Sequence, residues 1–443
     1  MLALLLLATS SAPELAAADP PSAAALHAGT TRGAIASAGD VDGDGVPDVH
    51  VAGRLSGTVD GQPFQGVETA GSIWTLSGAD GSVLRRHDLT GPAGGTEWLE
   101  PGYVKVFGRD LANAGDLDGD GVPDLVASGF VEGHAFSALV DVRSGRTGEV
   151  LRSVTTDETP GALRWSHAFA VAGGADLDFD GTPDVLIGRS ERDPAVIALS
   201  GRTWQPIFEF TAKREIGECV AFLPGLRVDP RPPVLGDVRP RVLFGGSRYY
   251  ERLAPSATVL TADGKPLQTA RSGVWDAAAL GDLDGDGQQE LLLSDCHYGV
   301  IAVSGATGET IWDHSSARGR ENNEGFSLAV LDADEGLVAI GANELVHWGL
   351  GVESDRGQVK VIRVGEEEPA WSLEAPLYGG FDVAAPGDVD GDGVADLALV
   401  ERRTQRAELR SGADLALVLW TVDLEPLARA RDAALAERLD EDR

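Results

Sequence analysis

A nine-residue acidic motif occurs five times and constrains the fold of this chain more than any other feature. Each copy has acids at positions 1, 3, 5 and 9 and a glycine at position 6, and each precedes a short apolar run. The copies are DVDGDGVPD at 40–48, DLDGDGVPD at 116–124, DLDFDGTPD at 176–184, DLDGDGQQE at 282–290 and DVDGDGVAD at 388–396. A motif that returns at long intervals indicates a repeat architecture in which each unit carries its own loop.

The spacing of the motifs predicts seven units. The successive starts Asp176, Asp282 and Asp388 are 106 residues apart, and half of that spacing, 53 residues, is close to the 60 that separate Asp116 from Asp176. We therefore expect one unit with an incomplete motif near residue 229 and another near residue 335. The longer first spacing, 76 residues from Asp40 to Asp116, predicts an insertion at 57–66 or at 91–101.

Each unit is expected to contain about four strands. The acidic loop joins two of them, and a later segment such as VIAVSGATGETIW at 300–312 reads as two strands joined by a turn. The strand after the loop is apolar at successive positions, as in VLIG at 185–188, so both of its faces should be covered. Sheets stacked around an axis cover both faces, and the sequence therefore predicts an all-β, seven-bladed β-propeller.

The order of segments resembles the FG-GAP (integrin alpha N-terminal) repeat and the related VCBS-type repeats. The similarity lies in an aromatic-glycine strand such as GFDVAAPGD at 380–388, followed by the acidic loop and an apolar strand. It implies a propeller with calcium-binding loops and a role in binding or adhesion. A weaker similarity to the tryptophan-ended repeats of quinoprotein propellers involves Trp312, Trp371 and Trp420.

The acidic motif has the composition of a calcium loop. Ca²⁺ takes six to eight oxygen ligands in irregular geometry, whereas Mg²⁺ demands a near-ideal octahedron. Carboxylates at positions 1, 3, 5 and 9 and a carbonyl at position 7 would supply these oxygens, giving about five Ca²⁺ sites. The predicted ligand residues are Asp40, Asp42, Asp44, Val46 and Asp48; Asp116, Asp118, Asp120, Val122 and Asp124; Asp176, Asp178, Asp180, Thr182 and Asp184; Asp282, Asp284, Asp286, Gln288 and Glu290; and Asp388, Asp390, Asp392, Val394 and Asp396.

The acidic motif has two other interpretations. An EF-hand needs a glutamate at position 12, but that position holds apolar residues in all five copies, namely Val51, Ala127, Ile187, Leu293 and Leu399. A simple Asp/Gly turn without metal is the alternative, since these residues favour turns. Four carboxylates within nine residues would repel one another without a cation, which favours the metal loop.

The composition and motifs narrow the function. The 70 acidic and 36 basic residues give a net charge of −34, which opposes nucleic-acid binding. The sequence contains no H-E-x-x-H, G-x-S-x-G, P-loop or C-x-x-C motif. The histidines, including His50, His134, His167 and His297, are expected to be surface or packing residues. We therefore predict a non-enzymatic protein and name no catalytic residue.

The sequence suggests three segments. Residues 1–18 resemble a signal peptide, 19–424 would form the propeller, and 425–443 read as a charged helical tail. A secreted, periplasmic or cell-surface monomer without a membrane span is expected. Its only two cysteines, Cys219 and Cys296, either pair or are separately buried.

The predicted function is a calcium-binding module for a protein or glycan ligand. The segment SRYYERL at 247–253 would lie on a connecting loop, where its two tyrosines could contact a partner or pack within the protein. The alternative is a propeller-based enzyme, either a polysaccharide lyase or a quinone-dependent dehydrogenase.

Overall fold

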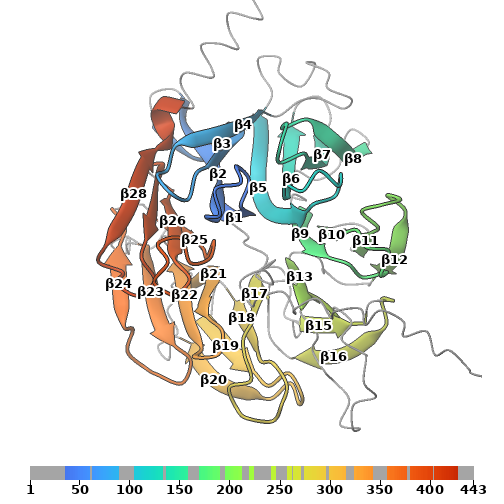
Figure 1. The fold of residues 1–443 in the computed structure, drawn as a ribbon, viewed down its shortest axis with the longest axis vertical. Coiled ribbons are helices and arrows are strands. Elements are labelled where there is room, and N and C mark those ends of the chain that lie inside the picture. The colour runs from blue at the N-terminus through green and yellow to red at the C-terminus, as the bar shows by residue number, and fades with distance from the viewer. Residues whose placement is uncertain are drawn as a thin grey trace, which may run out of the picture.

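The chain forms a ring of seven β-sheets. The computed structural model describes residues 35–59, 62–88, 104–132, 136–157, 169–189, 195–211, 219–223, 241–245, 257–261, 263–270, 274–295, 299–315, 324–342, 357–376, 380–402 and 404–427. In this part of the chain each sheet has four antiparallel strands. Figure 1 shows the sheets as blades around a central axis. The all-β, seven-bladed propeller predicted from the repeat is confirmed.

Each blade consists of four strands that follow one another along the chain. Blades 1 and 2 comprise β1 (Ile35–Gly39), β2 (Asp48–Val59), β3 (Gln62–Leu76) and β4 (Val83–Asp88), then β5 (Val104–Gly115), β6 (Asp124–Glu132), β7 (Phe136–Arg143) and β8 (Val150–Asp157). Blades 3 and 4 comprise β9 (Phe169–Ala175), β10 (Asp184–Arg189), β11 (Ala195–Leu199) and β12 (Pro206–Thr211), then β13 (Cys219–Leu223), β14 (Arg241–Gly245), β15 (Ala257–Leu260) and β16 (Pro266–Ala270).

The remaining three blades have the same order. Blade 5 comprises β17 (Asp276–Ala279), β18 (Leu291–Asp295), β19 (Gly299–Val303) and β20 (Thr310–Ser315). Blades 6 and 7 comprise β21 (Glu324–Asp332), β22 (Leu337–Ala342), β23 (Gln358–Arg363) and β24 (Trp371–Glu374), then β25 (Phe381–Ala384), β26 (Leu397–Glu401), β27 (Arg406–Arg410) and β28 (Val418–Asp423).

The two units with incomplete motifs are blades 4 and 6. In blade 6 the predicted remnant of the acidic loop is the turn at 333–336 between β21 and β22. Arg363 donates to the carbonyl oxygen of Glu335 at 2.7 Å and pairs with its carboxylate at 2.6 Å, so a guanidinium braces this shortened turn. In blade 4 the corresponding connection, 224–240, lies outside the described residues.

The insertion in the first unit lengthens a hairpin. Strands β2 and β3 have 12 and 15 residues, and their pairing continues to Val59 opposite Gln62. The insertion predicted at 57–66 is therefore confirmed as the tip of this hairpin. The other candidate, 91–101, lies outside the described residues.

The second strand of each blade is covered on both faces, as its sequence predicts. In β10 the side chains of Val185, Leu186 and Ile187 are all at most 3% exposed, although successive residues point to opposite faces of a strand. Neighbouring blades supply the cover on each side. The apolar runs after the acidic loops are therefore the cores between blades.

Buried aspartates on the inner strands join neighbouring blades. Asp110 of β5 accepts a hydrogen bond at 2.8 Å from the amide of Val171 in β9, and Asp276 of β17 accepts one at 2.8 Å from Leu328 in β21. Both carboxylates are at most 1% exposed. Such buried acceptors are stable only when they are hydrogen-bonded, so they fix the register of one blade against the next.

The ring closes by packing of blade 7 against blade 1. Trp420 of β28 donates its indole N–H to the carbonyl oxygen of Gly78 in the β3–β4 turn at 2.7 Å, and Ser37 of β1 donates to Pro386 at 3.2 Å. Gly81 of the same turn has a φ of +74°, and a Cβ at this position would lie 2.9 Å from the indole. Figure 1 shows the two blades side by side.

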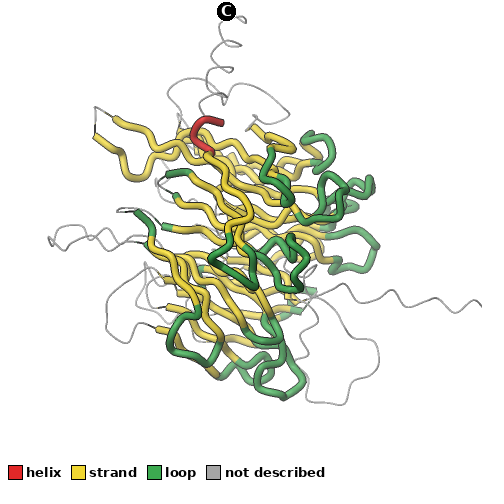
Figure 2. The backbone as a smooth tube through the Cα atoms, turned by 60° about the vertical axis from the view of Figure 1, so that its left-hand side comes forward, coloured by secondary structure: helices red, strands yellow, loops and turns green. Residues whose placement is uncertain are grey.

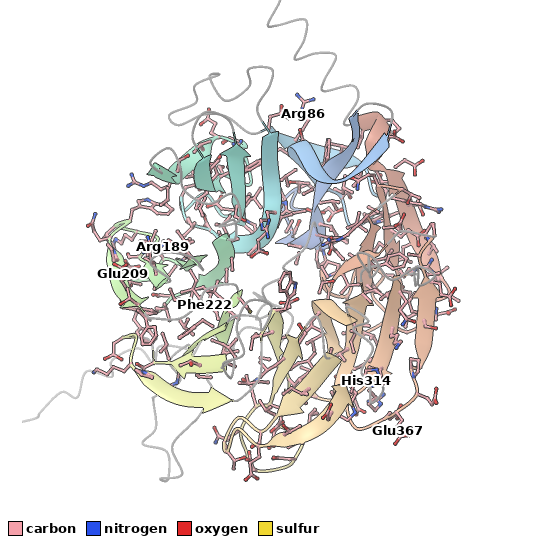
Figure 3. The ribbon with its side chains drawn as sticks, turned by 180° about the vertical axis from the view of Figure 1, so that it is seen from behind. Arg86, Arg189, Glu209, Phe222, His314 and Glu367 are labelled. Carbon is pink, nitrogen blue, oxygen red and sulfur yellow. The ribbon has the colours of Figure 1, made fainter. Side chains whose placement is uncertain are left out.

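Replacing Trp420 with Phe is expected to destabilise the ring more than replacing Trp312 with Phe. Trp312 of β20 makes the corresponding contact between blades 5 and 6, to Glu366 at 3.2 Å, at a seam marked by His314 and Glu367 in Figure 3. Both changes remove a hydrogen bond worth about 1 kcal/mol, but the Trp420 bond is shorter and its seam joins the first and last blades instead of two consecutive ones. Urea unfolding measures both losses, and a larger loss for Trp312→Phe would contradict this account.

The structure describes only a small part of the two terminal segments predicted from the sequence. Residues 424–427 form one helical turn, red in Figure 2, and Leu424 is buried against blades 1 and 7. The predicted signal peptide at 1–18 and the rest of the tail at 428–443 lie outside the described residues. Among the residues that the structure describes, no helix has the length and apolar character needed to cross a membrane.

Candidate metal centres

The five acidic loops lie between the first and second strands of blades 1, 2, 3, 5 and 7. In four of these blades a hydrogen bond joins the loop to the turn between the third and fourth strands, so both connections lie at the same end of the blade. In Figure 2 most described loop residues, drawn green, lie on one side of the strands. The propeller therefore has one face that carries the acidic loops.

The first acid organises each loop. In blade 1, Asp40 accepts hydrogen bonds from the amides of Gly43 at 2.7 Å and Gly45 at 3.0 Å. These glycines have φ values of +82° and +89°, a region that residues with a side chain rarely adopt. In blade 3 position 4 is Phe179 instead, with a φ of +60° and 58% of its side chain exposed.

Acids at positions 1, 3 and 9 converge in every one of these loops. Each offers a carboxylate oxygen within 4.8 Å of the others, and in blade 5 the position 5 acid joins them. The groups are Asp40, Asp42 and Asp48; Asp116, Asp118 and Asp124; Asp176, Asp178 and Asp184; Asp282, Asp284, Asp286 and Glu290; and Asp388, Asp390 and Asp396. The structure thus brings together the predicted acids at positions 1, 3 and 9 of each loop, and position 5 joins them only in blade 5.

In three of the other four loops the position 5 carboxylate contacts the hairpin turn instead of joining the converging group. Asp120 forms an ion pair at 2.9 Å with Arg146 of the hairpin turn, and Asp392 accepts a hydrogen bond at 2.9 Å from Ser411. Asp180 faces Ser200 of its own hairpin turn at 3.5 Å. These contacts draw the carboxylate toward the turn, and the spacing of acids in the sequence gives no sign of them.

The ninth acid fastens the loop to the blade. In blade 1, Asp48 is fully buried and accepts hydrogen bonds from the amides of Val41 at 2.7 Å and Gly78 at 2.9 Å. The same pair of amide bonds recurs at Asp124, Asp184 and Asp396. A single carboxylate in each of these blades therefore joins the acidic loop to the hairpin turn.

Burial makes the ninth acids difficult to ionise in the absence of a cation. It raises the pKa of Asp48 and of Asp124 to about 6 and that of Asp184 to about 7, while the amide hydrogen bonds oppose the rise. Burial also raises the pKa of Glu290 and Asp396. Neighbouring acids raise these pKa values further, and a bound cation would favour the ionised forms.

The residues present fit a hard divalent cation. In the blade 5 loop, Oε1 of Glu290 and Oε1 of Gln288 are buried and have no hydrogen-bond partner. A buried oxygen without a donor is costly, and a cation would satisfy both atoms. The amide nitrogen of position 7 donates to the position 5 carboxylate, for example from Val46 to Asp44 at 2.8 Å. A ligand role for the position 7 carbonyl stays a prediction.

A buried histidine pair, which the sequence did not reveal as a pair, lies in blade 1. Ring nitrogens of His50 and His87 contact the hydroxyl of Thr75 at 3.0 Å and 3.1 Å, and both histidines are at most 1% exposed. The expectation that His50 is a packing residue is confirmed. Its partner could have been found only by aligning β2, β3 and β4, because 37 residues separate the two histidines.

The tryptophans Trp74, Trp312 and Trp420 are buried, whereas Trp371 is half-buried. Cys219 is buried in β13, whereas Cys296 lies outside the described residues. The tyrosine segment at 247–253 and the histidines His134, His167 and His297 also lie outside them.

Comparison with known proteins gives local similarity to integrin alpha chains. The chain is 26% identical over 170 residues to integrin alpha-PS2 of Drosophila melanogaster, covering 36% of this chain and 12% of that protein. It is 31% identical over 102 residues to integrin alpha pat-2 of Caenorhabditis elegans, covering 23% of this chain and 7% of that protein. The chain therefore spans only a small part of these relatives, and no family model matches it.

A solved structure shares the fold. The exotype rhamnogalacturonan lyase YesX aligns with a TM-score of 0.51 and 15% identity, covering 87% of this chain and 72% of that chain. At this identity the similarity concerns the fold alone. The seven blades, the repeated acidic loops and the matches to integrin alpha chains together support an integrin-alpha-like FG-GAP propeller.

Proposed function

We propose that this protein is a calcium-stabilised binding module that acts outside the cell or at its surface. The observation that carries the proposal is the convergence of carboxylates, in nearly the same geometry, in five loops at one end of a propeller. If these loops served only as turns, there would be no reason for three acids to lie within 4.8 Å of one another in each of the five loops. The similarity to integrin alpha chains supports a binding role.

Calcium is the cation that the donors favour. Carboxylates at positions 1, 3 and 9 would hold it in all five loops, joined by position 5 in blade 5. Flexible loops with several carboxylates suit Ca²⁺, which accepts irregular oxygen shells, better than Mg²⁺. The ion would supply positive charge between the first and second strands of the blade and thereby stabilise the loop.

The face that carries the acidic loops is our candidate for the ligand surface. A Cβ at Gly39 would lie 2.9 Å from Pro123, one at Gly115 would lie 2.6 Å from Pro183, and Gly387 faces Pro47. The loops of blades 7, 1, 2 and 3 therefore touch in sequence and form a continuous arc. Loops held by a rigid scaffold commonly carry binding function, and the position 3 acids along this arc are exposed.

We propose a non-enzymatic role because the clustered acids are engaged in holding the loops. A buried acid such as Asp48 already accepts two amide hydrogen bonds and lies beside two further carboxylates, an arrangement that suits a cation better than a proton-transfer reaction. The ligand would be a protein or a glycan that contacts the exposed loops.

Binding to glycan and protein arrays, with calcium and with EGTA, tests this function. We expect binding to a defined ligand class in calcium and a strong reduction in EGTA, because the loops that form the surface lose their cations. Equal binding under both conditions would contradict a role for the loops. Cleavage of a bound polysaccharide would contradict the non-enzymatic proposal and favour a lyase.

A further inference from the structure

We infer that the acidic loop of blade 5, at 282–290, holds the tightest of the cation sites and fills first. This inference rests on the proposed calcium binding and assigns an order to the sites. Three features distinguish this loop from the other four: an additional converging carboxylate, a ninth acid without a hydrogen bond to the hairpin turn, and a carboxamide side chain at position 7.

The first feature is the number of carboxylates. Asp282, Asp284, Asp286 and Glu290 all offer an oxygen to one centre, whereas the other loops offer three. Position 5 of blade 2 is instead paired with Arg146, but the equivalent hairpin position in blade 5 is Ala306, which has no charge to compete for Asp286. Calcium affinity rises with the number of charged ligands, so the fourth carboxylate strengthens this site.

The second feature is the state of the ninth acid. Asp48 and its counterparts accept one amide from the acidic loop and one from the hairpin turn. Glu290 accepts only the loop amide, from Leu283, and its other oxygen, Oε1, is buried without a partner. Leaving such a buried oxygen without a donor is costly, more so when the group is charged, and a cation would remove that cost.

The third feature is the side chain at position 7. It is Gln288 in blade 5, where the other loops have valine or threonine. The amide oxygen of Gln288 is also buried without a partner. Two buried oxygens that lack donors, beside three further carboxylates, therefore meet in one loop. A cation there would replace the hydrogen bond by which the ninth acid fastens the loop elsewhere.

The position of the loop gives this site a separate structural role. Gly281 donates its amide to Ala333 at 2.8 Å, so the blade 5 loop abuts the shortened turn of blade 6, which lacks the full acidic motif. The other four loops are in the arc of blades 7, 1, 2 and 3. The blade 5 cation would thus stabilise the side of the ring that the arc does not reach.

Calorimetric titration of the chelated full-length protein with calcium tests the order of filling. We expect one equivalent to bind at least tenfold more tightly than the rest. Asp286→Asn should weaken that first step at least tenfold, because it removes the additional carboxylate. Asp44→Asn is the matched control: it changes an exposed position 5 acid outside the converging group of blade 1, so the first step should be unchanged.

A second variant tests the role of Glu290, the ninth acid of this loop. Glu290→Gln keeps the shape of the side chain and should remove the first step while leaving four later equivalents. Five equivalent sites in the native protein, or a first step that Asp286→Asn and Glu290→Gln leave intact, would overturn the inference while the proposed calcium binding still holds. A titration without calcium binding would instead overturn the proposed function itself.

Discussion

Chelation of calcium is expected to lower the melting temperature of this protein by about 10 °C or more. A cation that binds only the folded chain stabilises it by about 2.7 kcal/mol for each site when its concentration is 100 times the Kd. An unfolding entropy of about 2.1 cal/mol/K per residue means that about 1 kcal/mol shifts the melting temperature of a propeller of about 400 residues by roughly 1 °C, so five such sites together give a shift of this size. Circular dichroism with and without EGTA measures it.

The reason for a large effect lies in the buried ninth acids. Without a cation, burial and two neighbouring carboxylates disfavour the ionised forms of Asp48, Asp124 and Asp184, and a bound cation would remove this cost. Calcium added in excess over EGTA should restore the melting temperature, and the same concentration of Mg²⁺ should restore less of it. Coincident melting curves with and without EGTA would contradict stabilisation by bound calcium.

Acidification is expected to destabilise blade 1 through its histidine pair. Burial lowers the pKa of His50 to about 3 and that of His87 to about 2, and the positive charges of Arg143 and Arg85 add to the effect at His87. A histidine with a lowered pKa in the folded state is protonated only after unfolding. Stability is therefore intact above pH 6.5 and falls as the pH drops below it.

The size of this effect follows from proton linkage. Between pH 6.5 and pH 5 each histidine removes about 1.6 kcal/mol, so the pair removes roughly 3 kcal/mol. Asp141, which pairs with Arg143 at 2.8 Å, is the acidic group on the facing strand of blade 2 and is already engaged. The histidines therefore have no free carboxylate among the described neighbours to compensate a positive charge.

Comparison of the native protein with His87→Gln isolates the histidine contribution. Both proteins are measured in EGTA, where they carry the same loop carboxylates and no calcium that acid could release. The native protein should lose about 1.6 kcal/mol more than the variant between pH 6.5 and pH 5, measured by urea unfolding. Equal losses would show that His87 does not respond to acid in the folded protein.

Most of the fold could be predicted from the sequence because its repeat leaves several independent marks. The acidic loop, the doubly covered strand at 185–188 and the hairpin at 300–312 recur in a fixed order, so each supports the others. The two incomplete units were located from spacing alone. The closing contact of Trp420 with Gly78 was not, since the 342 residues between them carry no pattern that pairs them.

The acids that converge are among the residues that the sequence predicts as ligands, but the differences between the five loops could not be predicted from it. Position 5 is acidic in all five loops but joins the converging group only in blade 5, and the contacts that hold it at the hairpin turn in three of the other loops, such as that of Asp120 with Arg146, leave no mark in the spacing of the acids. The blade-joining role of Asp110 also depends on an amide 61 residues away. Such contacts depend on how the blades curve around the ring. The repeat in the sequence predicts a ring, but it does not predict which residues of neighbouring blades or turns meet.

The most direct test of the central claim is the calcium content of the purified protein after dialysis against calcium and removal of unbound metal. Five loops with converging carboxylates predict five Ca²⁺ per chain. Asp118→Ala, which removes one acid of the blade 2 group, should lower the ratio to four and leave the other sites filled. A chain without bound calcium, or a ratio that Asp118→Ala does not change, would contradict the account.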